Sequence, residues 1–346
     1  LDAYLTCGIL AHGCARAYCQ SCKHSELIAF SCKKRGICPS CEAKRAIIYA
    51  ETLHENILAP VPHRHIVFSI PKMLRAYFRY DRELHRFIFD AAWESLREWY
   101  ELRLPGSVPG AVFSIQTAGA SLNHNPHIHG VVSDGAFTPP GEFGRLGYID
   151  TAEINARFGE LLVQSMLYEN LISSDTVELL NSWSHSGFNL WAGSPITPDD
   201  ANARRFIARY IDRGPIALSR IQITNDIITY NADDELTHEF DPLELLARIS
   251  VHIPNKWEQT LRYLGWYSAR TRGARRAREE ITLVELSREQ LEESQKPSKN
   301  WAALIKRVYE VNPLACPKCN SEMKIVAFIT DYKAIKKITD NLGIAP

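Results

Sequence analysis

The chain has 346 residues, of which 45% are hydrophobic, so it can bury a sizeable core in two domains or in one domain with appendages. Its 40 basic and 40 acidic residues give a net charge of zero, so a DNA-binding surface would have to come from local clusters of basic residues. No apolar run approaches the roughly 18 residues of a membrane span, and no secretory signal is visible, so we expect a cytoplasmic protein without membrane contact.

The cysteines are distributed very unevenly, with seven of the nine in the first 41 residues. Disulfide scaffolds are typical of short secreted domains, so this clustering in a long chain indicates metal binding. Cys19-x-x-Cys22 and Cys38-x-x-Cys41 are separated by 15 residues, a spacing typical of a tetrahedral structural zinc site. Four thiolates complete the coordination sphere, so this Zn²⁺ is expected to be structural; the alternative is a set of buried thiols without metal.

A third pair, Cys316 and Cys319, has the same Cys-x-x-Cys spacing but no obvious partner nearby in the sequence. Two thiolates do not make a stable zinc site. The missing ligands could come from Cys7, Cys14 or Cys32, which would fold the C-terminus back onto the N-terminal module. The alternative is a turn of similar shape without metal.

Hydrophobic periodicity and the positions of Pro and Gly predict the secondary structure of the remaining chain. A helix over 42–58 ends before Pro60-Val61-Pro62, which marks a domain boundary. Further helices are predicted over 72–103, 151–181, 200–212, 241–252 and 301–310, and at the C-terminus. Strands are predicted over 64–70, 111–117 and 127–132, with a hairpin formed by 216–223 and 226–230. Residues 269–300 are charged and expected to be exposed.

The motif most suggestive of chemistry is Asn125-Pro126-His127-Ile128-His129-Gly130, on the strand predicted over 127–132. Residues i and i+2 of a strand point to the same face, so His127 and His129 lie side by side while Ile128 faces the core. Two such imidazoles suit a single divalent cation. His-x-His pairs also arise on strands by chance, so the motif depends on support from its neighbours.

A metal-dependent reaction on DNA would need further groups around these histidines. Gln116, on the preceding strand, offers its carbonyl oxygen as a third ligand; the alternative is a half-buried polar side chain. A helical tyrosine facing the metal could attack a phosphodiester and form a phosphotyrosine link. Tyr210, on the helix predicted over 200–212, and the Tyr263/Tyr267 pair are candidates, while packing is the default role of all three.

Three clusters of basic residues could bind phosphate. The first is Lys33-Lys34-Arg35, within the cysteine-rich module. The second surrounds Tyr210 and includes Arg209 and Arg213, and the third lies within 270–278. Each of them, taken alone, is equally well explained as a solvated surface.

From about Cys7 to Lys336 the chain resembles the rolling-circle transposases of the insertion-sequence-91 type, including the common-region elements. No single motif carries the resemblance, which rests on an ordered set of segments. The segments are residues 30–41, 68–72, 125–132, 183–188, 208–211 and 263–267.

The resemblance implies an α+β fold, with a central antiparallel sheet that holds the histidines, helices packed on it, and an N-terminal zinc-ribbon-like module. It implies a zinc-binding, DNA-binding module over 1–59, a catalytic domain over 60–270, and a charged linker, helix and Cys-x-x-Cys segment over 271–346. It also implies that Mg²⁺ or Mn²⁺ is the catalytic metal. The substrate would be single-stranded DNA at transposon ends in the bacterial nucleoid, nicked to leave a free 3′-OH for the host replication machinery.

The family's nucleophile corresponds to Tyr210. In two-tyrosine members its partner lies four residues earlier, where this chain has Phe206. The chain therefore looks like a single-tyrosine variant, in which a second nucleophile would come from the freed 3′-OH or from another protomer of an oligomer. Trp183, Phe188 and Trp191 are candidates for stacking on unpaired bases, with core packing as the alternative.

Two other classes of protein share part of this pattern. A plasmid replication initiator or relaxase has the same active site but is disfavoured by the zinc module and the whole-chain resemblance. A non-catalytic zinc-dependent DNA-binding protein would have no need of His127, His129 and Tyr210. A metalloprotease is excluded because no helix carries paired histidines around a glutamate.

Overall fold

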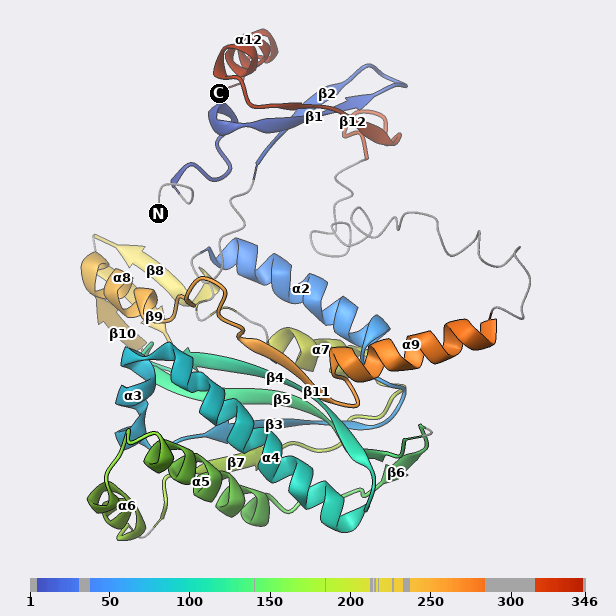
Figure 1. The fold of residues 1–346 in the computed structure, drawn as a ribbon. Coiled ribbons are helices and arrows are strands. Elements are labelled where there is room, and N and C mark those ends of the chain that lie inside the picture. Colours follow the sequence, from blue (N-terminus) through green and yellow to red (C-terminus); the bar gives the residue numbers. More distant parts are fainter. Residues whose placement is uncertain are drawn as a thin grey trace. The chain divides into compact units, whose positions relative to one another are not determined.

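The computed structural model describes residues 5–30, 38–139, 141–183, 185–211, 214, 216, 218–225, 227–232, 237–283 and 315–344. It divides into two compact units, a terminal unit of Leu1–Lys44 with Leu286–Pro346 and a central unit of Arg45–Glu285 (Figure 1). The last strand of the region expected over 271–346 joins the N-terminal strands in one sheet.

The terminal unit is built on a three-stranded antiparallel sheet in the order β12-β1-β2. Its strands are β1 (Cys14–Cys19), β2 (Ser25–Ala29) and β12 (Met323–Ile329). The 3-10 turn η1 (Leu10–His12) precedes the sheet, and the amphipathic helix α12 (Tyr332–Leu342) follows it. The terminal helix was expected, whereas β12 was missed. Helix α2 (Pro39–Asn56) begins in this unit and continues into the central one.

The central unit contains the predicted antiparallel sheet, so the α+β fold class is confirmed. The strand order is β11-β4-β5-β3-β7, and β6 pairs with β5. The strands are β3 (His63–Ser69), β4 (Val108–Ala118), β5 (His124–Phe137), β6 (Phe143–Arg145), β7 (Asn189–Ala192) and β11 (Leu261–Gly265).

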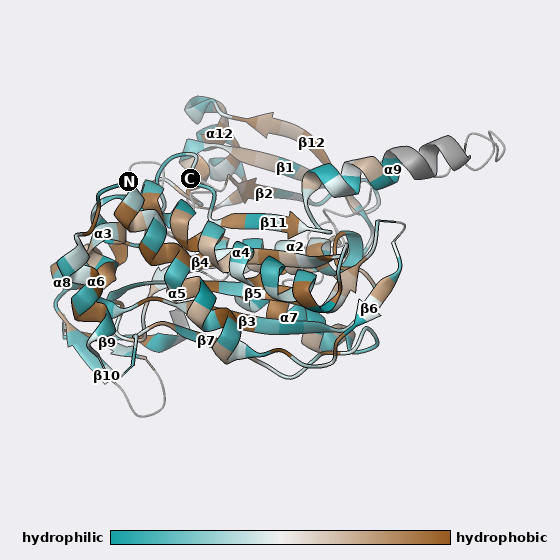
Figure 2. Ribbon diagram, turned by 60° about the horizontal axis from the view of Figure 1, so that its bottom comes forward, coloured by the Kyte–Doolittle hydropathy of each residue, from teal (hydrophilic) through white to brown (hydrophobic). Residues whose placement is uncertain are grey.

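Side-chain alternation gives this sheet two apolar faces. One face presents Ile66, Phe113 and Ile128 to α4 (His85–Arg103) and α5 (Thr151–Tyr168), where the larger hydrophobic core lies. Both helices are striped with hydrophobic and hydrophilic residues in Figure 2, as expected for amphipathic helices. The other face packs against α2 and α7 (Ala201–Ile211) in a second core. The functional residues lie on this second face.

Two of the predicted helices are interrupted. The expected helix over 72–103 is divided into η2 (Lys72–Leu74), α3 (Arg75–Tyr80), η3 (Arg82–Leu84) and α4. The break falls at Asp81, whose backbone is extended and whose carboxylate accepts a hydrogen bond from the amide of Glu83. The expected helix over 151–181 stops at Tyr168 and resumes as α6 (Ser174–Asn181) after Asn170, which has a φ of 55°.

A second, smaller sheet of the central unit has the order β10-β9-β8. It comprises β8 (Ile221–Thr224), β9 (Ile227–Asn231) and β10 (Thr237–Phe240), preceded by η4 (Leu218–Arg220) and followed by α8 (Pro242–Ser250). The predicted hairpin is present, but its first strand is shorter than expected because 218–220 form a 3-10 turn. Helix α9 (Ala269–Leu283) occupies part of the expected charged segment, and the helix predicted over 301–310 lies outside the described residues.

None of the helices in the described part of the chain has the length and apolar character required to cross a bilayer.

Candidate active site and zinc site

The two histidines of the strand motif lie side by side on β5, as the strand period predicts. His127 is paired with Gln116 of β4 and His129 with Ser114, while β3 places Ser69 and Val67 opposite them on the other side. The two Nε2 atoms are 3.0 Å apart. This separation is compatible with two nitrogen ligands on one cation, each about 2.0–2.2 Å from it.

The protonation of His127 is fixed by the backbone. Its Nδ1 lies 2.6 Å from the carbonyl oxygen of Asn125. A carbonyl only accepts, so Nδ1 carries the proton and Nε2 keeps its lone pair. Metal-binding histidines commonly donate their second ring nitrogen to a carbonyl in this way. The residues therefore fit a divalent cation at the Nε2 side.

A third histidine, His65, was missed by the sequence analysis. It lies on β3, and its Nε2 is 3.0 Å from Nδ1 of His129, with the two rings stacked at 5.2 Å. His129 is 5% exposed, and the His65 ring is a hydrogen-bonding neighbour of its Nδ1. The sequence contains a signal for it, because His63-Arg64-His65 is a second His-x-His pattern, at the start of the strand predicted over 64–70.

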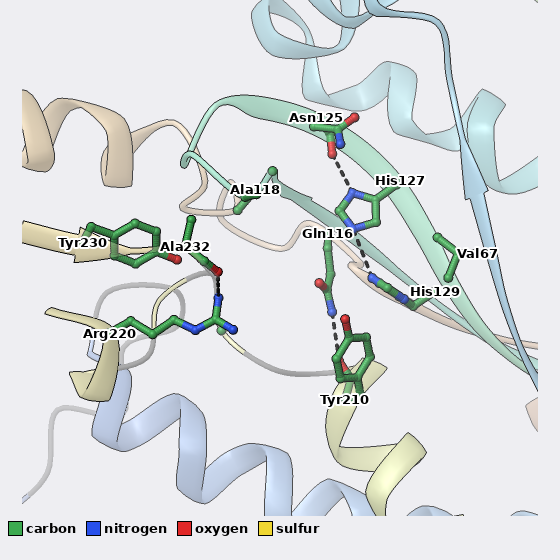
Figure 3. A pocket seen from close by; sticks show the side chains of 13 residues that line it. Val67, Gln116, Ala118, Asn125, His127, His129, Tyr210, Arg220, Tyr230 and Ala232 are labelled. Atoms are coloured by element: carbon green, nitrogen blue, oxygen red, sulfur yellow. Dashed lines mark hydrogen bonds between the residues drawn. The ribbon is translucent and has the colours of Figure 1, made fainter. Parts of the chain in front are cut away.

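Tyr210 lies in the last turn of α7, beside this histidine cluster. Its ring centroid is 5.1 Å from that of His129 and 5.5 Å from that of His65, nearly perpendicular to both. Figure 3 shows its hydroxyl directed towards Gln116 and the histidines. The structure thus brings together, from α7 and β5, three residues that the sequence suggested as a group.

The competing tyrosines have different surroundings. Tyr263 lies on β11, so the Tyr263/Tyr267 pair is not helical. Tyr267 is fully buried, with its hydroxyl 2.6 Å from Nε2 of His63, and burial raises its pKa well above the usual value. An inaccessible hydroxyl that resists ionisation is a poor nucleophile, so its role here is packing.

Gln116 contacts the helix end that carries Tyr210. Its Nε2 donates to the carbonyl oxygens of Tyr210, at 3.0 Å, and of Ile211, at 3.2 Å. Its Oε1 is turned towards the pocket in Figure 3. The side chain is therefore placed to hold the end of α7, and its oxygen remains available as the proposed third ligand.

Helix α7 is fixed at its other end by a buried guanidinium. Arg204 is 6% exposed and donates to the carbonyl oxygens of Leu58, Ala59 and Pro198. Burial lowers the pKa of Arg204 below its ordinary value. Arg204, Ala208 and Ile211 are the buried positions of α7, so Tyr210 emerges at the border of the core rather than within it.

The histidines and Tyr210 open onto a cavity of about 650 Å³. Across it lie residues of the small sheet, which the sequence analysis had not connected with the site (Figure 3). None of the described lining residues carries a carboxylate. These residues are Val67, Gln116, Ala118, Gly119, Ala120, Asn125, His127, His129, Tyr210, Gly214, Arg220, Tyr230 and Ala232. This described part of the cavity wall suits an anionic substrate.

The residues predicted to bind phosphate or to stack on bases differ in where the structure places them. Arg209 is exposed on α7, whereas Lys33, Lys34, Arg35 and Arg213 lie outside the described residues. Of the proposed stacking residues, Phe188 packs on Phe158 of the core, whereas Trp191 is 51% exposed and lies edge-on against His65. Trp183 is 38% exposed.

The cysteine cluster in the terminal unit corrects the predicted pairing. Cys19 and Cys22 meet Cys316 and Cys319, and all four sulfur atoms lie within 4.8 Å of one another. Sγ of Cys19 is 3.5 Å from that of Cys319, and Sγ of Cys22 is 3.4 Å from that of Cys316. Sulfurs bound to one tetrahedral zinc at 2.3 Å are about 3.8 Å apart, so the four residues fit Zn²⁺.

The reason for the correction is the sheet. Cys19 ends β1 and is paired with Met323, the first residue of β12, so the turns beside them meet. The Cys38–Cys41 pair instead spans the start of α2, where the amide of Glu42 donates to the carbonyl of Cys38. The C-terminus does fold back onto the N-terminal module, and among the described residues its partners are Cys19 and Cys22 rather than Cys7 or Cys14, while Cys32 lies outside the described residues.

One ligand is prepared for metal binding by its surroundings. Hydrogen bonds from Ser321, and then from Cys22, lower the pKa of the Cys319 thiol to about 6. The thiolate is the form that binds zinc.

Comparison with known proteins defines the class of this chain. Residues 110–275 match the family described as "Putative transposase", and residues 1–70 match the family described as "Transposase zinc-binding domain". The first match contains Gln116, both motif histidines and Tyr210. The protein is therefore a transposase with a zinc-binding domain, an enzyme class that cleaves DNA.

Two curated relatives identify the type. The chain is 25% identical over 347 residues to the transposase for insertion sequence element IS801 of Pseudomonas savastanoi pv. phaseolicola, covering 94% of this chain and 82% of the relative. It is 30% identical over 125 residues to the "Putative transposase y4qJ" of Sinorhizobium fredii, covering 36% of this chain and 31% of that protein. The chain belongs to the IS91 family of transposases. No solved structure matches it.

Proposed function

We propose that this transposase nicks and rejoins single-stranded DNA through a covalent link between Tyr210 and a 5′-phosphate, as a step of rolling-circle transposition. The observation that carries the proposal is the placement of the Tyr210 ring against His129 and His65, in a cavity whose described lining residues carry no carboxylate. We further infer that the protein acts on transposon ends in the bacterial nucleoid.

In the cleavage step, one phosphorus–oxygen bond of the DNA strand is exchanged for a bond to the tyrosine. The Tyr210 oxygen bonds to phosphorus, and the bond from phosphorus to the 3′ oxygen of the preceding nucleotide breaks. The proton of the tyrosine hydroxyl ends on the released 3′-hydroxyl, so atoms and charge balance without water or ATP. The phosphotyrosine keeps the bond energy, and a later attack by a 3′-hydroxyl rejoins the strand.

His127 and His129 would hold a divalent cation, Mg²⁺ or Mn²⁺, with Oε1 of Gln116 as the third candidate ligand. The bound cation would supply Lewis-acid polarisation of a non-bridging phosphate oxygen. Asn125 orients His127 through its carbonyl, and Gln116 and Arg204 hold the two ends of α7, so that Tyr210 faces the reacting phosphate.

In this proposal the chain uses a single tyrosine as its nucleophile. Phe206 lies one turn before Tyr210, 68% exposed, with ring centroids 6.3 Å apart. It occupies the place of a second nucleophile but has no hydroxyl. Completion of strand transfer would therefore use the freed 3′-hydroxyl, extended by the host replication machinery, or Tyr210 of another protomer.

An unpaired strand is favoured as the substrate by the surroundings of the site. Trp191, at the sheet edge beside His65, is exposed enough to stack on a base. Stacking on aromatic side chains is the common means of holding single strands, because every base has a π-face.

The test is covalent trapping. We expect the purified protein with Mg²⁺ or Mn²⁺ to form an adduct, stable to denaturation, with 3′-labelled single-stranded oligonucleotides that tile the ends of its own element. Tyr210→Phe should abolish the adduct, whereas Tyr168→Phe, an exposed tyrosine of α5, should leave it unchanged. An adduct with Tyr210→Phe would refute the nucleophile, and normal cleavage by His127→Ala would refute the metal site.

A further inference from the structure

We propose that Arg220 forms a phosphate-binding subsite for the DNA strand, on the wall of the cavity that faces the histidines. The inference rests on the proposed function for the identity of the substrate, but its geometry is independent of Tyr210. The subsite belongs to the small β8–β10 sheet, so this sheet would hold the strand from the side opposite the catalytic residues.

The guanidinium of Arg220 is oriented by the backbone. Arg220 is the last residue of η4 and directly precedes β8, and its Nη1 donates to the carbonyl oxygen of Ala232 at 2.6 Å. In Figure 3 the side chain runs along the pocket wall and presents its end to the cavity, across from Gln116 and His127. One donor is thus used for orientation while others remain for a ligand.

Arg220 brings a positive charge to the described wall of the cavity. It is the one permanently charged side chain among the described lining residues, and it has no ion-pair partner within the described part of the chain. Many other arginines here are paired, for example Arg82 with Glu258 and Arg157 with Glu98. The planar fork of an arginine matches two phosphate oxygens, and such charge-assisted bonds are stronger than neutral ones.

The subsite is tied to the histidine strand by buried contacts. Leu122, in the turn between β4 and β5, packs into the core of the small sheet with Ile228 and Tyr230. The carbonyl of Leu122 accepts a hydrogen bond from Nε2 of His252. Nδ1 of the same histidine is hydrogen-bonded to the hydroxyl of Thr117 of β4. Arg220 is therefore held at a defined distance from the histidines, as a phosphate subsite requires.

The subsite can be tested by equilibrium binding without catalysis. In the Tyr210→Phe background, the Kd of a fluorescent single-stranded oligonucleotide from the element end would be measured at several salt concentrations. We expect Arg220→Gln to raise the Kd roughly tenfold and to reduce the salt-dependence slope by about 0.7, the value for one phosphate contact on a single strand. Arg97→Gln is the matched control, since Arg97 lies on α4, on the other side of the sheet.

A second measurement locates the contact. Among oligonucleotides with a neutral methylphosphonate at one position, one that binds the Arg220 protein more weakly should bind Arg220→Gln no more weakly than the unmodified strand does. Arg220→Lys, which keeps the charge but not the fork, should lie between the two proteins, and it replaces Arg220→Gln if that variant fails to fold.

The outcomes separate this proposal from the proposed function. If Arg220→Gln and Arg220→Lys both match the Arg97→Gln control in Kd and in the salt dependence of Kd, the subsite is refuted. This holds even when the wild-type protein forms the Tyr210 adduct. A loss of binding limited to one base identity would also refute it, because a phosphate contact is sequence-independent. Failure of the wild-type protein to form an adduct would refute the proposed function but would leave the Arg220 subsite untouched.

Discussion

At the scale of single residues, the histidine cluster shows how one side chain sets the chemistry of another. If His129 binds a cation through Nε2, its Nδ1 must carry the proton and donate to Nε2 of His65, 3.0 Å away. His65 is then a positioning residue, because it orients the ring of His129 without contacting the cation. Trp191 and Tyr210 enclose the ring of His65 edge-on, which limits its rotation.

This arrangement predicts that His65→Ala weakens Mn²⁺ binding by about 10–100-fold, the usual effect of losing a partner behind a metal ligand. The Mn²⁺ dissociation constant, measured by electron paramagnetic resonance, checks it. His65→Gln keeps an acceptor and should restore part of the affinity. His185→Ala, an exposed histidine, should have no effect. Equal Mn²⁺ affinity in His65→Ala and the parent would show that His65 does not position His129.

At the scale of elements, α7 is the part on which the site depends. It is short and carries both an anchor, Arg204, and the proposed nucleophile, Tyr210, less than two turns apart. The anchor satisfies carbonyls at the end of α2 and at the start of α7, so a shift of the helix would leave buried polar groups without partners.

We therefore expect Arg204→Met to lower the free energy of unfolding of the central unit by about 2–3 kcal/mol, because it removes a charged donor from buried carbonyls. Chemical denaturation followed by tryptophan fluorescence measures this. Arg205→Met is the matched control: its ion pair with Glu51 is partly exposed, so its loss should cost below about 1 kcal/mol. Equal losses in the two variants would refute the anchoring role.

At the scale of the whole molecule, the two ends of the chain form one folded unit. Cys22 and Cys316 are 294 positions apart, yet their sulfurs are 3.4 Å apart. Among the described residues the core beside them is small, with Ala17, Cys19, Cys316 and Met323 buried and Ile28 and Ile325 packed against them. Such a core gives little stability by itself, so metal binding would contribute much of the folding energy of the terminal unit.

The corresponding prediction is that Cys316→Ser lowers the zinc content by about one ion per protomer, since three thiolates hold zinc far less tightly than four. Elemental analysis of the purified full-length chain measures it. Lys318→Ser changes the same turn without removing a ligand and should keep the parent zinc content. Unchanged zinc in Cys316→Ser would contradict the observed pairing and favour a site made by Cys19, Cys22, Cys38 and Cys41.

Local periodicity was sufficient for the features that depend on a few neighbouring residues. The strand period placed His127 and His129 on one face, helix signals located α7 and its tyrosine within about one residue, and the Cys-x-x-Cys spacing identified thiol pairs. These features follow from backbone geometry, which neighbouring residues determine. Local signals also gave wrong predictions, because the helices predicted over 72–103 and 151–181 are interrupted at Asp81 and at Asn170.

The tertiary structure alone decided which of these groups meet. Pairing of β1 with β12 selected the zinc ligands, pairing of β3 with β5 brought His65 to His129, and the packing of Leu122 placed Arg220 across the cavity. Each depends on strand register or on side chains far apart in the sequence, so no local pattern specifies it. The chain thus contains its reactive residues as local motifs, whereas their assembly into sites is a property of the sheets.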